Sequence, residues 1–149
     1  MTGARVLRIL VVEDEPVNRA LLRAVIGAAT RLGSPEVDEA DTLAAARTIV
    51  RDRHPDVLIL DVRLPDGNGL ELARELPPQG TAGRPHVVVM SASVLPPDRE
   101  AALASGGDAF VGKPFLPREL IAVLEGLLDG DGAAAPEATG PGPSWRRGR

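Results

Sequence analysis

Short apolar runs alternate with segments of helical periodicity along most of this chain, and this alternation restricts the fold more than any other feature. Five such pairs can be counted between residue 5 and about residue 128. Apolar runs that are each followed by a helix are typical of βαβ units, which place their strands parallel in one sheet. The pattern therefore predicts an α/β protein with a doubly wound, five-stranded parallel sheet.

The expected elements follow from this periodicity and from the capping and turn residues between the runs. Strands are expected at residues 6–12, 37–40, 56–61, 86–90 and 108–112. Helices are expected from Pro16 to a stop at Gly33, from Asp41 or Thr42 to His54, and at residues 70–76, 97–105 and 117–128. The apolar character of the first strand predicts burial on both faces, as a central parallel strand requires.

The apolar stripe of each helix predicts which side packs on the sheet. In the first helix the predicted face consists of Val17, Leu21, Val25 and Leu32. In the second helix it consists of Leu43, Ala46, Ile49 and Val50, and in the last helix of Leu120, Leu124 and Leu127.

Length and composition indicate one globular domain followed by a tail. The 149 residues suit a single domain, and the 44% hydrophobic and 26% charged residues are ordinary for one. We expect the domain at residues 1–128. Residues 129–149 are rich in Gly, Pro and Ala and have little apolar material to bury, so a disordered tail is expected there, with no output domain.

Charge and cysteine content limit the expected partners and compartment. The only dense basic run is residues 145–149, which is too short for a nucleic-acid footprint, so no direct nucleic-acid partner is expected. No apolar stretch is long enough for a signal-peptide core or a membrane span, so no membrane partner is expected. The lack of cysteine fits a reducing compartment, and we expect a cytoplasmic protein.

Chemically reactive side chains follow the predicted strands, where an open parallel sheet binds its ligands. Three carboxylates brought to one edge repel each other unless a cation neutralises them, and hard oxygen ligands of this kind suit Mg²⁺. A lysine and a serine hydroxyl nearby could bind phosphoryl oxygens. Together these are the parts of phosphoryl transfer with a carboxylate nucleophile. The residues concerned are Glu13 and Asp14, Asp61, Ser91 and Ala92, and Lys113.

Four motifs, in order and at the ends of predicted strands, resemble the signatures of response-regulator receiver domains of two-component signalling. The resemblance covers roughly residues 5–128 and implies a flavodoxin-like fold with strand order 2-1-3-4-5. It also implies a stand-alone signalling switch that catalyses only its own phosphorylation and dephosphorylation. The motifs are Glu13-Asp14-Glu15-Pro16, the segment from Leu60 to Gly69, Met90-Ser91-Ala92, and Val111-Gly112-Lys113-Pro114-Phe115.

The resemblance also implies a role for each matching residue. Asp61 would accept a phosphoryl group from a histidine kinase or a phosphotransfer protein. Mg²⁺ would be held by Asp14, Asp61 and the backbone carbonyl of Arg63, with Glu13 acting through a metal-bound water. Lys113, Ser91 and the backbone of Ala92 would contact the phosphoryl group, and Ser91 and Phe110 would form the switch. A cis peptide bond is implied between Lys113 and Pro114.

The output would pass to a downstream protein target, and whether phosphorylation drives formation of a homodimer is left open.

A Mg²⁺-dependent phosphatase or phosphotransferase with an Asp nucleophile would also need Asp, Lys and Ser at strand ends. Such enzymes typically carry a second acidic residue two positions after the nucleophile, and here that residue is Arg63. A dinucleotide-binding fold is set aside because no G-x-G-x-x-G follows the first strand.

Overall fold

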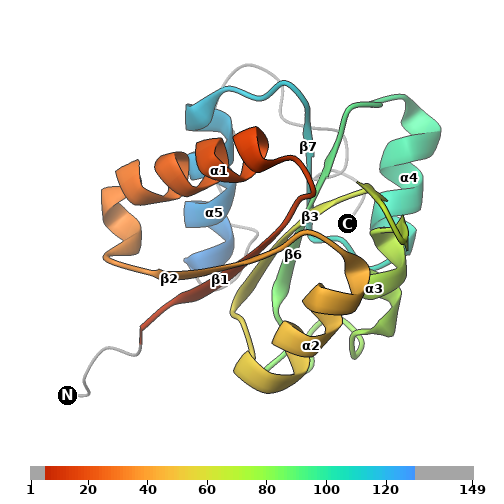
Figure 1. Cartoon of the computed structure of the whole chain (residues 1–149), viewed down its shortest axis with the longest axis horizontal. Helices are drawn as coiled ribbons and strands as arrows, with labels where there is room; N and C mark the ends of the chain where they lie inside the picture. Colours follow the sequence, from red (N-terminus) through yellow and green to blue (C-terminus); the bar gives the residue numbers. More distant parts are fainter. Residues whose placement is uncertain (1–5, 130–149) are drawn as a thin grey trace.

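A five-stranded parallel sheet forms the centre of the protein (Figure 1), and the computed structural model describes residues 6–129. The strand order is β2-β1-β3-β6-β7, with every neighbouring pair parallel. Numbered without the two short strands β4 and β5, this is the predicted order 2-1-3-4-5. The strands are β1 (Arg8–Val12), β2 (Glu36–Ala40), β3 (Val57–Asp61), β6 (His86–Ser91) and β7 (Ala109–Gly112).

Helices cover both faces of the sheet, which confirms the doubly wound prediction. Helices α1 and α5 lie together on one face, and the other three lie on the opposite face (Figure 1). The bounds are α1 (Pro16–Ala28), α2 (Leu43–Arg53), α3 (Leu70–Glu75), α4 (Pro96–Ala104) and α5 (Pro117–Leu128), with a 3-10 turn at Thr30–Leu32. None of the helices within residues 6–129 is both long and apolar enough to span a membrane.

The core lies between the sheet and these helices. Every residue of β3 is buried, as are the last four residues of β1, because central parallel strands pack against helices on both faces. Leu120, Leu124 and Leu127 of α5 are buried as predicted. In α2, Leu43 and Ala46 are buried, while Ile49 and Val50 pack against the core at its edge.

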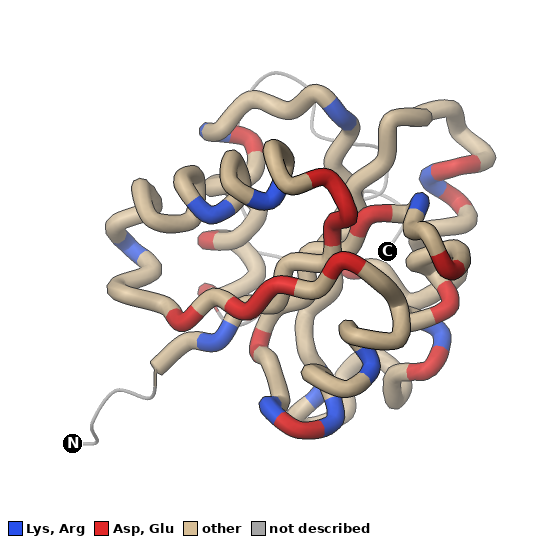
Figure 2. Tube along the Cα trace, viewed as in Figure 1, with Lys and Arg blue, Asp and Glu red and all other residues tan. Residues whose placement is uncertain are grey.

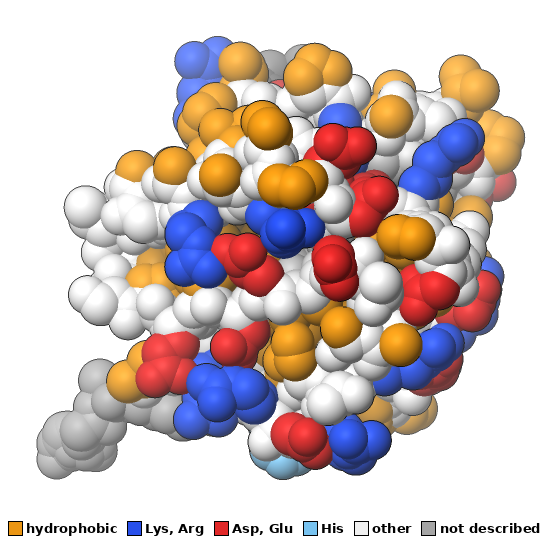
Figure 3. Space-filling view, in the orientation of Figure 1, with side chains coloured by type: hydrophobic (Ala, Val, Ile, Leu, Met, Phe, Trp, Pro, Cys, Tyr) orange, Lys and Arg blue, Asp and Glu red, His pale blue; other side chains and the backbone are white. Residues whose placement is uncertain are grey.

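The predicted face of the first helix is wrong in part. Val17 is 77% exposed and Leu21 is 45% exposed, and apolar side chains lie along the outer surface of α1 (Figure 3). The buried residues are Leu22, Val25 and Ile26. This helix carries two apolar stripes, and packing against the sheet and α5 selects the second. The helix also ends at Ala28, so its periodicity does not extend to Leu32.

The segment after β3, which is rich in turn-forming residues, contains a short antiparallel ribbon. Its strands are β4 (Arg63–Leu64) and β5 (Gly67–Asn68), with Arg63 opposite Asn68. The ribbon turns the chain back between Asp61 and α3. The predicted tail at residues 129–149 falls almost wholly outside the described residues, since only Asp129 lies within them.

Arg84 fastens the Pro/Gly-rich linker between α3 and β6 to the loop before β7. Its guanidinium donates hydrogen bonds to the carbonyl oxygens of Pro77 and Gly106, at 2.8 and 2.7 Å. It also pairs with Asp108 at 3.0 Å, and the Arg84 side chain is only 5% exposed. Asp108 in turn accepts a hydrogen bond from the backbone N–H of Val87. The linker is therefore held at the amino-terminal edge of the sheet.

We expect Arg84→Ala to lower the free energy of unfolding by roughly 2–3 kcal/mol, because it leaves a partly buried carboxylate and carbonyl groups without their cationic donor. The loss stays below the largest values because Val87 still donates to Asp108. Urea denaturation measures the change. The matched control is Arg51→Ala, whose ion pair with Asp52 is exposed and should contribute little to stability. Equal losses in the two variants would contradict this account.

Candidate functional site

The carboxyl ends of the strands bring the predicted acidic residues together. Carboxylate oxygens of Glu13, Asp14 and Asp61 all lie within 4.8 Å of one another. Lys113 adds a positive charge, with its Nζ 3.1 Å from Glu13 Oε1 and 3.2 Å from Asp61 Oδ2. Figure 2 shows acidic positions gathered where β1 ends and α1 begins, beside the end of β2. The cluster joins residues up to 100 positions apart in the sequence.

The segment of Glu13 and Asp14 is held between β1 and α1 by its own backbone. The N–H of Glu13 donates to the carbonyl of Ala40 at the end of β2, at 3.0 Å. Arg19 of α1 donates to the carbonyl of Glu13 at 2.9 Å. The Glu13 carboxylate accepts from the N–H of Glu15 at 3.0 Å and from Lys113. Glu13 is therefore a buried carboxylate in a defined orientation, while Asp14 is only partly buried.

Asp61 is the last residue of β3 and is 7% exposed. Burial raises the pKa of its carboxyl, and the nearby charge of Glu13 raises it further, while Lys113 works in the opposite direction. A raised pKa means that the ionised form is disfavoured where it stands. A bound cation would relieve this, and three converging carboxylates are the oxygen donors that Mg²⁺ prefers, so the residues fit that ion.

Lys113 follows β7 and is held in place by the strand beside it. Its N–H donates to the carbonyl of Ser91 at 2.8 Å, and the Lys113-Pro114 peptide bond is cis, as the resemblance implied. Burial alone would lower the pKa of the Lys113 ammonium, but Glu13 and Asp61 more than offset that and raise it. The lysine is therefore charged at neutral pH and faces both buried carboxylates.

The two predicted switch residues lie on the strands next to this cluster. Ser91 ends β6 and is buried, and its hydroxyl oxygen accepts a hydrogen bond from the N–H of Ser93 at 3.1 Å. Phe110 lies in β7 and is also buried. The structure brings Ser91 close to the acidic cluster through β6, but the switch roles of Ser91 and Phe110 stay predictions.

An open groove of about 600 Å³ lies between the β4–β5 ribbon and the start of α4. Its lining includes Arg63, Ser91, Ser93 and Asp98, and the Ser93 hydroxyl donates to the Asp98 carboxylate. The groove gives a polar surface next to the buried cluster. Arg63 itself is exposed, and its N–H points at Asp61 Oδ1 from 3.4 Å.

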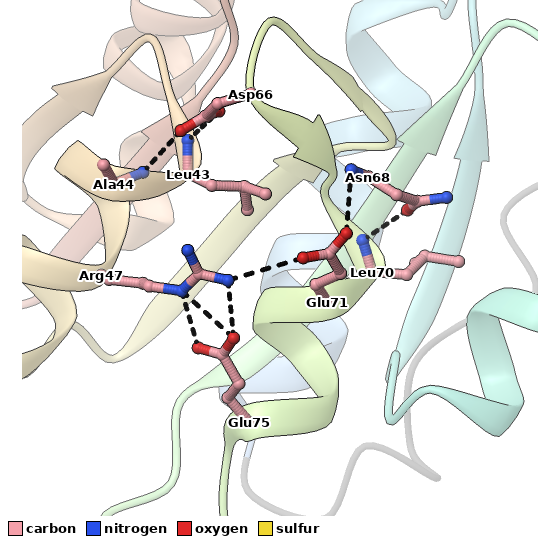
Figure 4. Close-up of polar contacts among 8 residues, drawn as sticks. All are labelled: Leu43, Ala44, Arg47, Asp66, Asn68, Leu70, Glu71 and Glu75. Atoms are coloured by element: carbon pink, nitrogen blue, oxygen red, sulfur yellow. Dashed lines mark hydrogen bonds and ion pairs between the residues drawn. The ribbon is translucent and has the colours of Figure 1, made fainter.

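Asp66 lies among turn-forming residues in the sequence, and the structure gives it long-range partners. Its carboxylate accepts hydrogen bonds from the N–H groups of Leu43 and Ala44, the first residues of α2 (Figure 4). These bonds lower the pKa of Asp66. The sequence carries no signal for this contact, because an Asp among turn residues is consistent with a local turn alone.

Comparison with protein families gives a match over most of the chain. A model described as the response regulator receiver domain matches residues 9–125. That range contains every residue predicted for the site.

Individual relatives agree with this match. The phosphate regulon transcriptional regulatory protein PhoB of Pseudomonas aeruginosa is 34% identical over 136 residues, which are 91% of this chain and 54% of PhoB. The two-component response regulator ORR41 of rice is 34% identical over 122 residues, covering 80% of this chain and 93% of ORR41. The chain spans about half the length of several curated relatives that it matches.

A solved structure with a similar fold carries a metal. The receiver domain of the sensor histidine kinase PA1611 from Pseudomonas aeruginosa is 28% identical with a TM-score of 0.68, covering 81% of this chain and 96% of that one. That structure has a magnesium ion coordinated in its active site cleft.

Proposed function

This chain belongs to the response regulator receiver domain family, and we propose that it is phosphorylated on Asp61 in a Mg²⁺-dependent reaction. The observation that carries the proposal is the convergence of Glu13, Asp14 and Asp61 around the ammonium of Lys113. The phosphoryl donor would be a histidine kinase or a histidine phosphotransfer protein. The chain is a signalling switch, and the only reactions it would catalyse are its own phosphorylation and dephosphorylation.

Each residue has a part in the proposed transfer. One carboxylate oxygen of Asp61 forms a bond to phosphorus while the P–N bond of the donor's phosphohistidine breaks and its electron pair stays on the imidazole. Asp14, Asp61 and the carbonyl of Arg63 would hold Mg²⁺, with Glu13 acting through a water. The bound ion would neutralise charge on the phosphoryl oxygens.

Lys113 and Ser91 would act after transfer as well as during it. Lys113 already contacts Asp61, so its ammonium is in place to pair with a phosphoryl oxygen. Ser91 would leave the N–H of Ser93 and donate its hydroxyl proton to the phosphoryl group, with the backbone of Ala92 as a further contact. Phe110, on the neighbouring strand, would then repack and change the surface offered to a downstream protein.

We expect the signal to pass by contact with another protein, with phosphorylation-dependent self-association as one form of that contact.

A Mg²⁺-dependent phosphatase or phosphotransferase with an Asp nucleophile has less support, because an arginine stands two positions after Asp61 and the chain belongs to the receiver family.

The proposal is tested by incubating the protein with acetyl phosphate and Mg²⁺ and measuring its intact mass. We expect a gain of one phosphoryl group that is lost in base, as an acyl phosphate should be. A metal chelator should abolish the gain, because the single charge of Lys113 does not neutralise three carboxylates, which then repel the anionic donor. If no phosphoryl group is gained, or if the chelator has no effect, the proposal is wrong.

A further inference from the structure

The loop that follows Asp61 is fastened to the amino-terminus of α2 by the side chain of Asp66 (Figure 4). One carboxylate oxygen accepts from the N–H of Leu43 at 2.8 Å, and the other accepts from the N–H of Ala44 at 3.0 Å. These are two of the N–H groups that a helix cannot bond internally, and a carboxylate suits the positive end of the helix dipole. Asp66 therefore caps a helix that begins 23 residues earlier.

Apolar packing also holds the loop that follows Asp61 against the amino-terminus of α2. The backbone of Gly67 has a φ of 150°, and a side chain built on it would come within 2.9 Å of Leu43 Cδ1. Leu43 is buried in the core, so it cannot easily move away. The loop thus rests directly on the first residue of α2, and only a glycine allows that close approach.

A second set of contacts braces the far side of the loop (Figure 4). The N–H of Asn68 donates to Glu71 of α3 at 3.5 Å, and Arg47 of α2 pairs with Glu71 at 3.6 Å. Arg47 also pairs with Glu75 of α3 at 2.7 Å. The loop therefore sits in a frame formed by α2 and α3.

The connection between β2 and α2 also holds the other half of the acidic cluster. The N–H of Glu13 donates to the carbonyl of Ala40, the last residue of β2, and Leu43 begins α2 three residues later. Residues 40–44 are thus bonded on one side to the segment of Glu13 and Asp14. On the other side they are bonded to the loop after Asp61, through Asp66. Both segments that would supply metal ligands are attached to one short stretch of backbone.

We propose that Asp66 is a positioning residue for the metal site, which sets where the Arg63 carbonyl lies relative to Asp14 and Asp61 by tying its loop to α2. This inference rests on the proposed function, because it takes the Arg63 carbonyl to be a ligand. Both carboxylate oxygens of Asp66 are bonded to α2, so Asp66 itself would contact neither the metal nor the phosphoryl group. Without the Asp66 side chain, all the metal ligands should still be present, but the Arg63 carbonyl should occupy a wider range of positions.

The test measures metal affinity without any turnover. Mn²⁺ is titrated into the unphosphorylated protein, free Mn²⁺ is counted by electron paramagnetic resonance, and Mg²⁺ is added as competitor. We expect Asp66→Ala to weaken binding on the order of tenfold, the low end of what groups that orient metal ligands contribute. Asp66→Asn keeps one oxygen acceptor for the helix and should recover part of the loss.

Thr42→Ala is the matched control. The Thr42 hydroxyl oxygen accepts from the N–H of Ala45, so its loss removes a cap from the same end of α2 without cutting the bond to the loop. Both alanine variants should lower the melting temperature, but only Asp66→Ala should weaken Mn²⁺ binding. Phosphorylation of Asp66→Ala by acetyl phosphate should be slow at low Mg²⁺ and return to the wild-type rate at saturating Mg²⁺.

The outcomes separate this inference from the proposed function. If wild type takes up a phosphoryl group and Asp66→Ala binds Mn²⁺ as wild type does, the positioning role is wrong and the function stands. Equal weakening by Thr42→Ala would also overturn it, because helix stability alone would then explain the effect. If wild type itself takes up no phosphoryl group, it is the proposed function that fails.

Discussion

Asp61→Asn is expected to give a folded protein that takes up no phosphoryl group from acetyl phosphate or from a phosphohistidine donor. The amide has no anionic oxygen to attack phosphorus, and Asp61, at the end of the central strand, is one of the two carboxylates that Lys113 contacts. Intact-mass measurement after incubation with Mg²⁺ checks the result. The expected loss is complete, which makes it the largest functional effect of any single change proposed for this chain.

The same substitution should leave the free energy of unfolding unchanged or raise it. Burial and the charge of Glu13 both raise the pKa of Asp61, so the ionised carboxylate is less stable in the metal-free protein than it would be in water. A neutral amide of the same shape removes that repulsion, and Lys113 keeps its contact with Glu13. Urea denaturation without Mg²⁺ should give a free energy of unfolding at or above that of wild type. Function would be lost without loss of fold.

Asp52→Asn is the control for the change of charge. Asp52 is an exposed carboxylate on α2 that pairs only weakly with the neighbouring Arg51, so its replacement should leave phosphorylation as it is. Retained phosphorylation in Asp61→Asn would show that another residue is the acceptor. An unfolded Asp61→Asn protein would contradict the stability argument instead.

Gly69→Ala is expected to lower the free energy of unfolding by more than about 3 kcal/mol. A Cβ atom at this position would lie 2.0 Å from the carbonyl oxygen of Asp61 and 3.2 Å from Leu60 Cδ1. The obstacle is buried strand backbone, which cannot rotate away as a flexible side chain could. The N–H of Gly69 also donates to the carbonyl of Val62 at 2.7 Å, so moving Gly69 would cost this hydrogen bond.

Gly27→Ala is the matched control, since its Cβ would meet no atom within 4 Å. Gly27 lies in the last turn of α1, where alanine should be neutral or stabilising by about 0.5–1 kcal/mol because it restricts the unfolded chain. Urea denaturation of both variants measures the difference. A Gly69→Ala protein as stable as wild type would mean that the backbone of Asp61 can shift, and that the site is less rigid than its contacts indicate.

Sequence reasoning reached the fold because each local pattern agreed with the architecture. The predicted strands ended within one residue of the observed ones, and the side chains at or just after the ends of β1, β3 and β7 met as the geometry of a parallel sheet requires. It went wrong on α1, where Val17 and Leu21 point outward. Two apolar stripes fit one helix equally well by spacing, and only the packing partner selects between them.

The sequence by itself determined the order of the elements, the acidic cluster and the lysine that accompanies it, because these depend on periodicity and on residues directly after strands. The tertiary structure decided the rest. It tied Asp66 to a helix that lies earlier in the chain, joined Arg84 to Asp108, and brought Gly69 against the backbone of Asp61. Such contacts join residues that are distant in sequence or depend on how a loop turns. A periodic pattern encodes the face of an element, and it carries no information about which distant backbone group a single side chain meets.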